Sequence, residues 1–203
     1  MQMIHLVDDD EAVTRSCSFL LESLGYTVQC WNQSERFLHE AALKDTGVVL
    51  LDMRMPGMDG HRLFQAMRHD NSTLAVIFLT GHGDIPMAVK EIQSGAVDFL
   101  QKPVALDALK EAISKGYEHS ERLAKIQELK QRYGQLTPKE KAVAHYVAAG
   151  MMNKDIASQM NIALRTVEVH RSRVMEKMDA RTMAELIMQM NSIDLSGENL
   201  IKQ

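Results

Sequence analysis

The chain has 203 residues, of which 45% are hydrophobic and 25% are charged, values that are ordinary for a globular protein of one or two domains. No apolar run approaches the roughly 18 residues of a membrane span, and the run at residues 3–7 is too short for a signal peptide, so we expect a cytoplasmic protein with no membrane partner. Residues 1–121 carry 10 Lys and Arg against 18 Asp and Glu, whereas residues 122–191 carry 12 against 7.

This charge asymmetry favours an acidic domain followed by one that meets nucleic acid. The alternative is a chance imbalance between two solvated surfaces. Cys17 and Cys30 are the two cysteines of the chain, and we expect both to be reduced thiols.

Short apolar runs alternate with helical periodicity through the first part of the chain. Apolar runs of about four to eight residues bounded by turn residues are typical of strands buried on both faces. Five strand–helix units in succession predict a doubly wound parallel sheet with helices on both faces. The predicted strands are residues 3–7, 26–31, 47–52, 75–80 and 97–102, and the predicted helices are residues 12–23, 34–44, 60–69, 85–94 and a helix from 106 onward. Ser34 and Asp84 are expected to cap the second and fourth helices.

Polar side chains stand where the predicted strands end. Asp8 and Asp9 follow the first strand, and Asp52 ends the third. Because ligands bind at the carboxyl ends of strands in open α/β sheets, these carboxylates are expected to converge, where they repel one another unless a cation such as Mg²⁺ lies between them. Asp52 is then a nucleophile toward phosphorus that forms an aspartyl phosphate. Thr80 and Lys102, which end the fourth and fifth strands, are placed to contact the phosphoryl oxygens.

Each of these residues also has a structural interpretation when it is taken alone. The run at residues 8–10 favours helix capping, Thr80 suits a strand or turn, and Lys102 before Pro103 suits the surface. The functional interpretation depends on all of them falling at the carboxyl ends of strands in one domain.

The stretches "VDDDE", "LLDMRMPGMDG", "LTGHGD" and "DFLQKP" together resemble the receiver domain of response regulators, over about residues 1–121. The resemblance implies that Asp52 accepts a phosphoryl group from a sensor histidine kinase. It also implies a Mg²⁺ site formed by Asp8, Asp9, Asp52 and the backbone carbonyl of Arg54.

The same resemblance implies a switch. Thr80 and Lys102 match the family's switch hydroxyl and phosphate-binding lysine, and Phe99 takes its aromatic switch position. There, an aromatic ring can move inward when Thr80 is drawn to the phosphoryl group. A static aromatic is the alternative for Phe99. The bond between Lys102 and Pro103 is expected to be cis.

Residues 118–136 are rich in charge but keep an apolar stripe at helical spacing, which favours a helical linker over a disordered one. A short coiled coil is the alternative, although a strict heptad is not sustained. Thr137, Pro138 and Glu140 then match the N-cap, the N1 position and the capping box of a new helix. Asn153 is expected to cap a short helix that leads, through a turn at residues 161–164, to a longer helix at 165–178, and a further helix follows at 182–190.

A short helix followed by a turn and a longer helix that is polar outside predicts a helix-turn-helix. On the longer helix, Val167, His170, Val174 and Met178 are expected to face inward. Its outward Arg, Glu and Val side chains suit base edges in a major groove, and flanking cations suit phosphates. A solvated amphipathic helix is the alternative. The candidate DNA-binding residues are Lys154, Arg165, Thr166, Glu168, Val169, Arg171, Ser172, Arg173 and Lys177.

The stretches "LTPKE", "NKDIA" and "TVEVHRSRVMEKM" resemble the four-helix DNA-binding domain of the LuxR/NarL/FixJ family, over about residues 134–191. The resemblance implies binding to two half-sites as a dimer. Ala163 departs from the family pattern, because many members place a capping Ser at this position.

The sequence therefore predicts an α/β doubly wound receiver domain (residues 1–121), a helical linker (122–136) and a small all-α four-helix helix-turn-helix domain (137–203). The leading hypothesis is a two-component response regulator that is not an enzyme. When phosphorylated, it would dimerise, bind promoter DNA and act with RNA polymerase.

Two other functions were weighed against this hypothesis. A Mg²⁺-dependent phosphohydrolase with an aspartyl-phosphate intermediate, of the haloacid-dehalogenase kind, needs an acid two residues after the nucleophile, where this chain has Arg54. An architectural DNA-binding protein that is never phosphorylated would not need the acidic residues at the strand ends.

Overall fold

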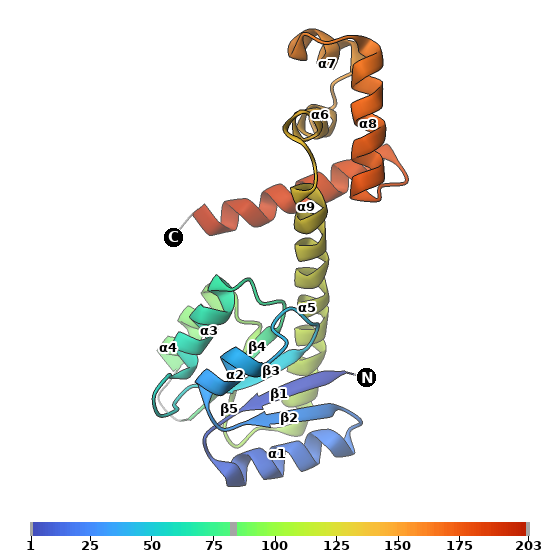
Figure 1. Ribbon diagram of the computed structural model, residues 1–203. Coiled ribbons are helices and arrows are strands. Elements are labelled where there is room, and N and C mark those ends of the chain that lie inside the picture. The colour runs from blue at the N-terminus through green and yellow to red at the C-terminus, as the bar shows by residue number, and fades with distance from the viewer. Residues whose placement is uncertain (1, 82–84, 202–203) are drawn as a thin grey trace. The chain divides into compact units, whose positions relative to one another are not determined.

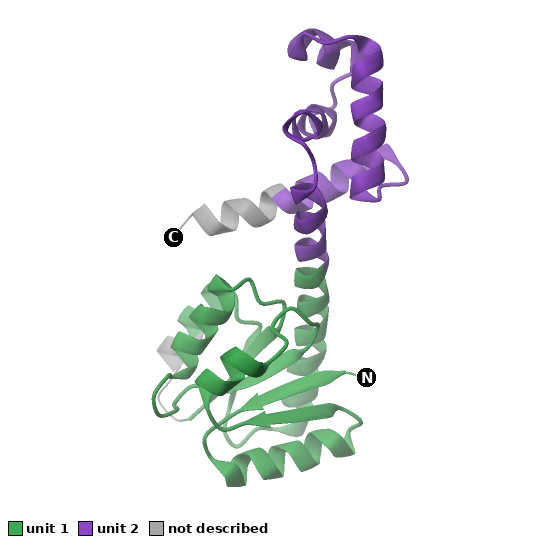
Figure 2. Cartoon of the chain, in the orientation of Figure 1, with its two compact units in different colours: residues 1–124 green, residues 125–203 purple. Residues whose placement is uncertain are grey.

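A computed structural model describes residues 2–81 and 85–201, with side chains described at residues 2–81 and 89–193. Contacts divide the chain into two compact units, residues 1–124 and 125–203 (Figure 2). Helix α5 (Leu106–Gly134) contributes residues to both units. The domain boundaries predicted at residues 121 and 136 stay a prediction. Among the described residues, no helix is long and apolar enough to cross a membrane.

The first unit is built on a five-stranded sheet in the order β2-β1-β3-β4-β5, with every pair of neighbours parallel (Figure 1). The strands are β1 (Met3–Val7), β2 (Thr27–Trp31), β3 (Val48–Asp52), β4 (Ala75–Thr80) and β5 (Asp98–Gln101). This arrangement confirms the predicted doubly wound parallel sheet. The order also places the ends of β1, β3 and β4 next to one another, which positions the site described below.

Helices cover both faces of this sheet. They are α1 (Glu11–Ser23), α2 (Ser34–Glu40), α3 (Gly60–His69), α4 (Ile85–Gln93) and the first part of α5. The prediction that Ser34 caps α2 is wrong: Gln33 is the N-cap, and the Ser34 hydroxyl donates to the Met58 carbonyl at 2.7 Å. Asp84, expected to cap α4, lies outside the described residues.

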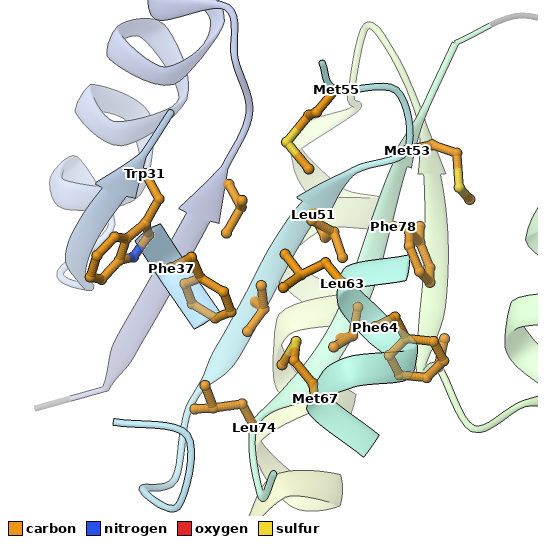
Figure 3. Close-up of a cluster of buried hydrophobic side chains, with 14 residues drawn as sticks. Trp31, Phe37, Leu51, Met53, Met55, Leu63, Phe64, Met67, Leu74 and Phe78 are labelled. Carbon is orange, nitrogen blue, oxygen red and sulfur yellow. The ribbon is translucent and has the colours of Figure 1, made fainter. Parts of the chain in front are cut away.

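Two apolar clusters lie on opposite sides of the sheet because alternate residues of each strand point to opposite faces. On one side, Phe37 of α2 and Leu63 and Phe64 of α3 pack against the sheet (Figure 3). On the other side, Leu21 of α1 and Ile113 of α5 do so. The central strand β3 contributes to both clusters and is buried along its whole length.

The second unit is helical. Its helices are the end of α5, α6 (Pro138–Ala148), α7 (Asn153–Met160), α8 (Leu164–Met178) and α9 (Met183–Ile201). The capping box of Thr137 and Glu140 is confirmed. The prediction that Asn153 caps α7 is wrong, because Met152 is the N-cap and Asn153 is the first helical residue. The core is formed mainly by aliphatic and methionine side chains from α6, α7, α8 and α9.

Candidate functional site

Asp52 ends β3 and is almost fully buried. Its Oδ2 accepts a hydrogen bond from the Arg54 backbone nitrogen at 2.8 Å, which orients the carboxylate. The loop that follows returns to the strand, since the Gly60 nitrogen donates to the Met53 carbonyl at 3.2 Å. A Cβ at Gly60 would lie 2.3 Å from the Asp52 carbonyl oxygen, so this close approach requires glycine.

Two further carboxylates follow β1, the neighbour of β3 in the sheet. Carboxylate oxygens of Asp8, Asp9 and Asp52 lie within 4.8 Å of one another; Asp8 is buried and Asp9 is exposed. Asp10 instead caps α1, accepting from the Ala12 nitrogen at 2.8 Å. The acidic run after β1 therefore supplies both a helix cap and two residues of the cluster.

Lys102 contacts two of the three carboxylates in this cluster. Its Nζ lies 2.5 Å from Asp8 Oδ2 and 2.5 Å from Asp52 Oδ1. Burial by itself lowers the pKa of Lys102, but the hydrogen bonds and charges of the two carboxylates raise it overall, so the side chain is a cation. Burial raises the pKa of Asp52, and the bonds from Lys102 and Arg54 oppose that shift. The bond between Lys102 and Pro103 is cis.

The residues of the predicted switch lie on the next two strands. Thr80 ends β4 and is buried, and its carbonyl accepts from the Lys102 nitrogen at 2.8 Å. Phe99 is the neighbour of Phe78 in the ladder between β4 and β5, and it lies half-buried against the cluster that holds Phe37 and Leu63. The structure therefore brings Asp8, Asp9, Asp52, Thr80 and Lys102 to one edge of the sheet.

The three carboxylates form a donor set for a hard divalent cation. Mg²⁺ prefers oxygen ligands and commonly combines one or two carboxylates with phosphate oxygens. Asp8 and Asp52 offer buried oxygens, while the exposed Asp9 leaves a side of the cluster open to solvent. The residues present therefore fit Mg²⁺.

A second candidate site is the exposed face of α8. Val167, Val174 and Met178 are buried as predicted, whereas His170 is half-buried. The outward residues Arg165, Thr166, Val169, Ser172 and Arg173 are exposed, and Lys154 is exposed on α7. Glu168 is half-buried, and its Oε2 lies 3.0 Å from Arg165 NH1. Ala163, the N-cap of α8, makes no side-chain cap bond.

Two candidate cations of α8 have partners within the second unit. Arg171 donates to the Asn153 side chain of α7. Lys177 is 2.7 Å from Glu140 Oε2 and donates to the Gln135 carbonyl at 3.2 Å. Glu140 is buried, so Lys177 compensates a buried charge, and its contact with a DNA phosphate stays a prediction.

Arg132 at the end of α5 was not a candidate. It donates to the carbonyl of Met178, 46 positions along the chain. Neither periodicity nor a local motif marks such a pair, so the sequence offers no signal for it.

Comparison with known proteins decides the family. Residues 4–114 match the response regulator receiver domain, and residues 134–190 match bacterial regulatory proteins of the luxR family. The chain belongs to the FixJ/NarL-type two-component response regulators. The response regulator thus combines a receiver with a LuxR-type DNA-binding domain, and it is a transcriptional regulator.

Curated relatives match this response regulator over nearly its whole length. It is 58% identical over 187 residues to the tetrathionate response regulatory protein TtrR of Salmonella typhimurium, covering 92% of this chain and 91% of that protein. It is 39% identical to the transcriptional regulatory protein FixJ of Bradyrhizobium diazoefficiens, covering 91% and 92%.

Two solved structures also resemble the response regulator along most of the chain. The response regulator StyR has a TM-score of 0.68 and 35% identity, covering 94% of this chain and 98% of StyR. Full-length FixJ from B. japonicum has a TM-score of 0.57 and 36% identity, covering 96% and 98%.

Proposed function

We propose that a sensor histidine kinase phosphorylates Asp52, and that the phosphorylated chain binds promoter DNA as a dimer and acts with RNA polymerase on transcription. One observation carries the first step: the Asp52 carboxylate lies in a cluster with Asp8 and Asp9 and contacts the Lys102 ammonium at 2.5 Å. A nucleophile, a cation and an oxygen donor set therefore meet at one point.

The chemistry follows from this arrangement. A carboxylate oxygen of Asp52 attacks the phosphorus of the kinase's phosphohistidine; the new O–P bond forms as the P–N bond breaks, and the nitrogen keeps the electron pair. Lys102 then exchanges Asp52 for a phosphoryl oxygen, and the Thr80 hydroxyl moves to donate to another. Mg²⁺, held by Asp8, Asp9, Asp52 and the Arg54 carbonyl, would neutralise phosphoryl charge when bound.

Asp52→Asn tests this assignment. The variant keeps the shape of the side chain but lacks the nucleophilic oxygen charge. After incubation with acetyl phosphate and Mg²⁺, intact mass should show one added phosphoryl group in the wild type and none in the variant. Asp107→Asn, which alters an exposed aspartate at the start of α5, is the matched control and should gain the group. Equal phosphorylation of Asp52→Asn and the wild type would contradict the proposal.

Glu168→Ala tests the proposed base-reading face of α8, formed by Arg165, Thr166, Glu168, Val169 and Ser172. A lost base contact costs roughly 1–3 kcal/mol and relaxes preference at one base pair. Glu168 also pairs with Arg165, so its removal frees a cation. We expect Glu168→Ala to lose discrimination at one position per half-site while keeping or gaining non-specific affinity at low salt.

The measurement is a titration on specific and scrambled duplexes at several salt concentrations. Arg173→Ala provides the contrast, since a lost phosphate contact weakens binding to both duplexes and lowers the salt slope by about one. Equal weakening of both duplexes by Glu168→Ala would mean that the residue is structural.

The signal is also proposed by similarity. The relative TtrR is named as a tetrathionate response regulator, and it aligns with both units of this chain. We propose that this regulator serves the same response. A strain lacking the gene should lose the transcriptional change that tetrathionate causes, and the wild-type gene should restore it while Asp52→Asn should not.

A further inference from the structure

The C-terminal end of helix α8 is held by the chain segment that precedes α6. Arg132 NH1, in the last turn of α5, donates to the carbonyl of Met178 at 3.0 Å and lies 3.1 Å from Asp179 Oδ2. In return, α8 supplies a donor to this segment, because the Lys177 ammonium donates to the Gln135 carbonyl. The two bonds are reciprocal: each segment supplies one cation and one carbonyl to the other.

These contacts are of the kind that fixes a helix end. The last carbonyls of a helix lack intrahelical partners and carry partial negative charge, so a guanidinium there satisfies an acceptor and complements the helix dipole. Arg132 is mostly buried, and Glu128 Oε1 holds its NH2 at 2.8 Å, so the guanidinium is oriented before it meets α8. Charge-assisted bonds to an oriented guanidinium are stronger and more directional than neutral bonds.

The two ends of α8 are not held alike. At the N-terminal end, Ala163 makes no cap bond, and the residues of the proposed base-reading face lie in the first three turns. At the C-terminal end, Arg132 and Lys177 fix the last turn, and Lys177 is itself anchored on the buried Glu140. The contacts of Arg132 and Lys177 therefore add to the packing of the buried Val167 and to the bond between Arg171 and Asn153 in setting the position of the base-reading face.

We propose that Arg132 is a positioning residue for DNA recognition, and that the functional DNA-binding unit begins within α5, before the matched luxR-family region at residues 134–190. Arg132 contacts no base and no phosphate in this proposal; it acts through the carbonyl of Met178 on the orientation of α8. The inference rests on the proposed function, in which α8 reads base edges.

Arg132→Gln in the full-length chain tests the proposal. The substitution removes the positive charge and the set of N–H donors of the guanidinium group. Loss of one base contact corresponds to a roughly 5- to 150-fold loss of affinity for the specific duplex, and we expect Arg132→Gln to fall within this range. Because no phosphate contact is lost, the salt slope and the affinity for a scrambled duplex should match the wild type, unlike the result expected for Arg173→Ala. Lys125→Gln, the same charge change at an exposed position of α5, should leave all three quantities unchanged.

Asp179→Asn is a second variant that tests the same contact if Arg132→Gln folds poorly. Asp179 is an exposed partner of Arg132, and its replacement should give a smaller loss in the same quantity, specific affinity alone. If the wild type itself does not prefer the specific duplex, the proposed function fails. If the wild type is selective but Arg132→Gln and Asp179→Asn behave like Lys125→Gln, or weaken both duplexes equally, only the positioning role is overturned.

Discussion

At the scale of single residues, His5 and Trp31 form a buried hydrogen-bonded pair between β1 and β2. The indole nitrogen of Trp31 donates to His5 Nδ1 at 3.1 Å, and the imidazole also meets the Phe37 ring edge-on. An accepting Nδ1 carries no proton, so this core requires a neutral imidazole. Burial lowers the pKa of His5, against the opposing charge of Asp45.

The stability of the first unit should therefore depend on pH through His5. The unfolded chain, with a histidine pKa near 6.5, binds a proton more readily than the folded chain. The free energy of unfolding should accordingly fall as pH decreases below about 6.5, until His5 titrates in the folded state. Urea denaturation followed by Trp31 fluorescence across this range measures the effect, because Trp31 is the sole tryptophan.

His5→Asn is the control for this prediction. Asn keeps an acceptor oxygen but does not titrate, so its profile should be flatter than that of the wild type. The difference between the two profiles isolates His5 from the other histidines. Parallel profiles would contradict the prediction.

At the scale of elements, His61 of α3 and Glu91 of α4 form a polar contact between the two helices. His61 Nδ1 lies 2.6 Å from Glu91 Oε1, and Glu91 is completely buried. The second oxygen of Glu91, Oε2, has no hydrogen-bond partner among the described residues. An unpaired buried oxygen costs free energy. The Glu91 carboxyl is therefore stabilised through Oε1 alone.

A double-mutant cycle at this pair should show strong coupling. His61→Leu leaves the buried Glu91 carboxyl without its partner and should lower the free energy of unfolding by about 1–3 kcal/mol. His61→Leu with Glu91→Leu should recover most of that loss, because an apolar pair of similar volume needs no hydrogen bond. Urea denaturation of the wild type, both single variants and the double variant gives the coupling energy. A double variant less stable than His61→Leu would refute this.

At the scale of the whole molecule, the proposed dimerisation requires that phosphorylation change the surface that the receiver presents to a second copy. Helix α4 follows the end of β4, where Thr80 lies, and it exposes Val89 and Ile92, two apolar side chains on a surface open to a partner. Met87, a third candidate, has its side chain outside the described part. We propose that Thr80 and Lys102 draw toward the phosphoryl group and that this face of α4 then forms a symmetric dimer.

Light scattering checks this prediction. Wild-type protein phosphorylated with acetyl phosphate should double its mass at tens of micromolar. Val89→Lys with Ile92→Lys should stay monomeric while still gaining the phosphoryl group. Phe19→Lys, which changes an exposed apolar residue of α1, should dimerise normally. If the double variant Thr80→Ala with Lys102→Ala still dimerises after treatment with acetyl phosphate, these two residues do not form the switch.

The sequence by itself determined which polar residues stand at the carboxyl ends of the strands. Asp8, Asp52, Thr80 and Lys102 could be located because each stands at the end of a predicted strand, and parallel strands bring their carboxyl ends to one edge. The capping box at Thr137 was equally predictable, since both of its bonds join residues three positions apart. Local spacing and strand direction carry this information.

The tertiary structure alone decided which polar groups hold the helices together. Ser34 and Asn153 are residue types that commonly cap helices. Nevertheless, the Ser34 hydroxyl donates to the carbonyl of Met58, and the Asn153 side chain accepts from Arg171. Lys177 was predicted as a phosphate contact from its position on α8, and only the fold shows that it also donates to Glu140 and Gln135. A buried polar group takes whichever partner packing brings within reach, and that partner can lie tens of residues away, where no periodicity records it.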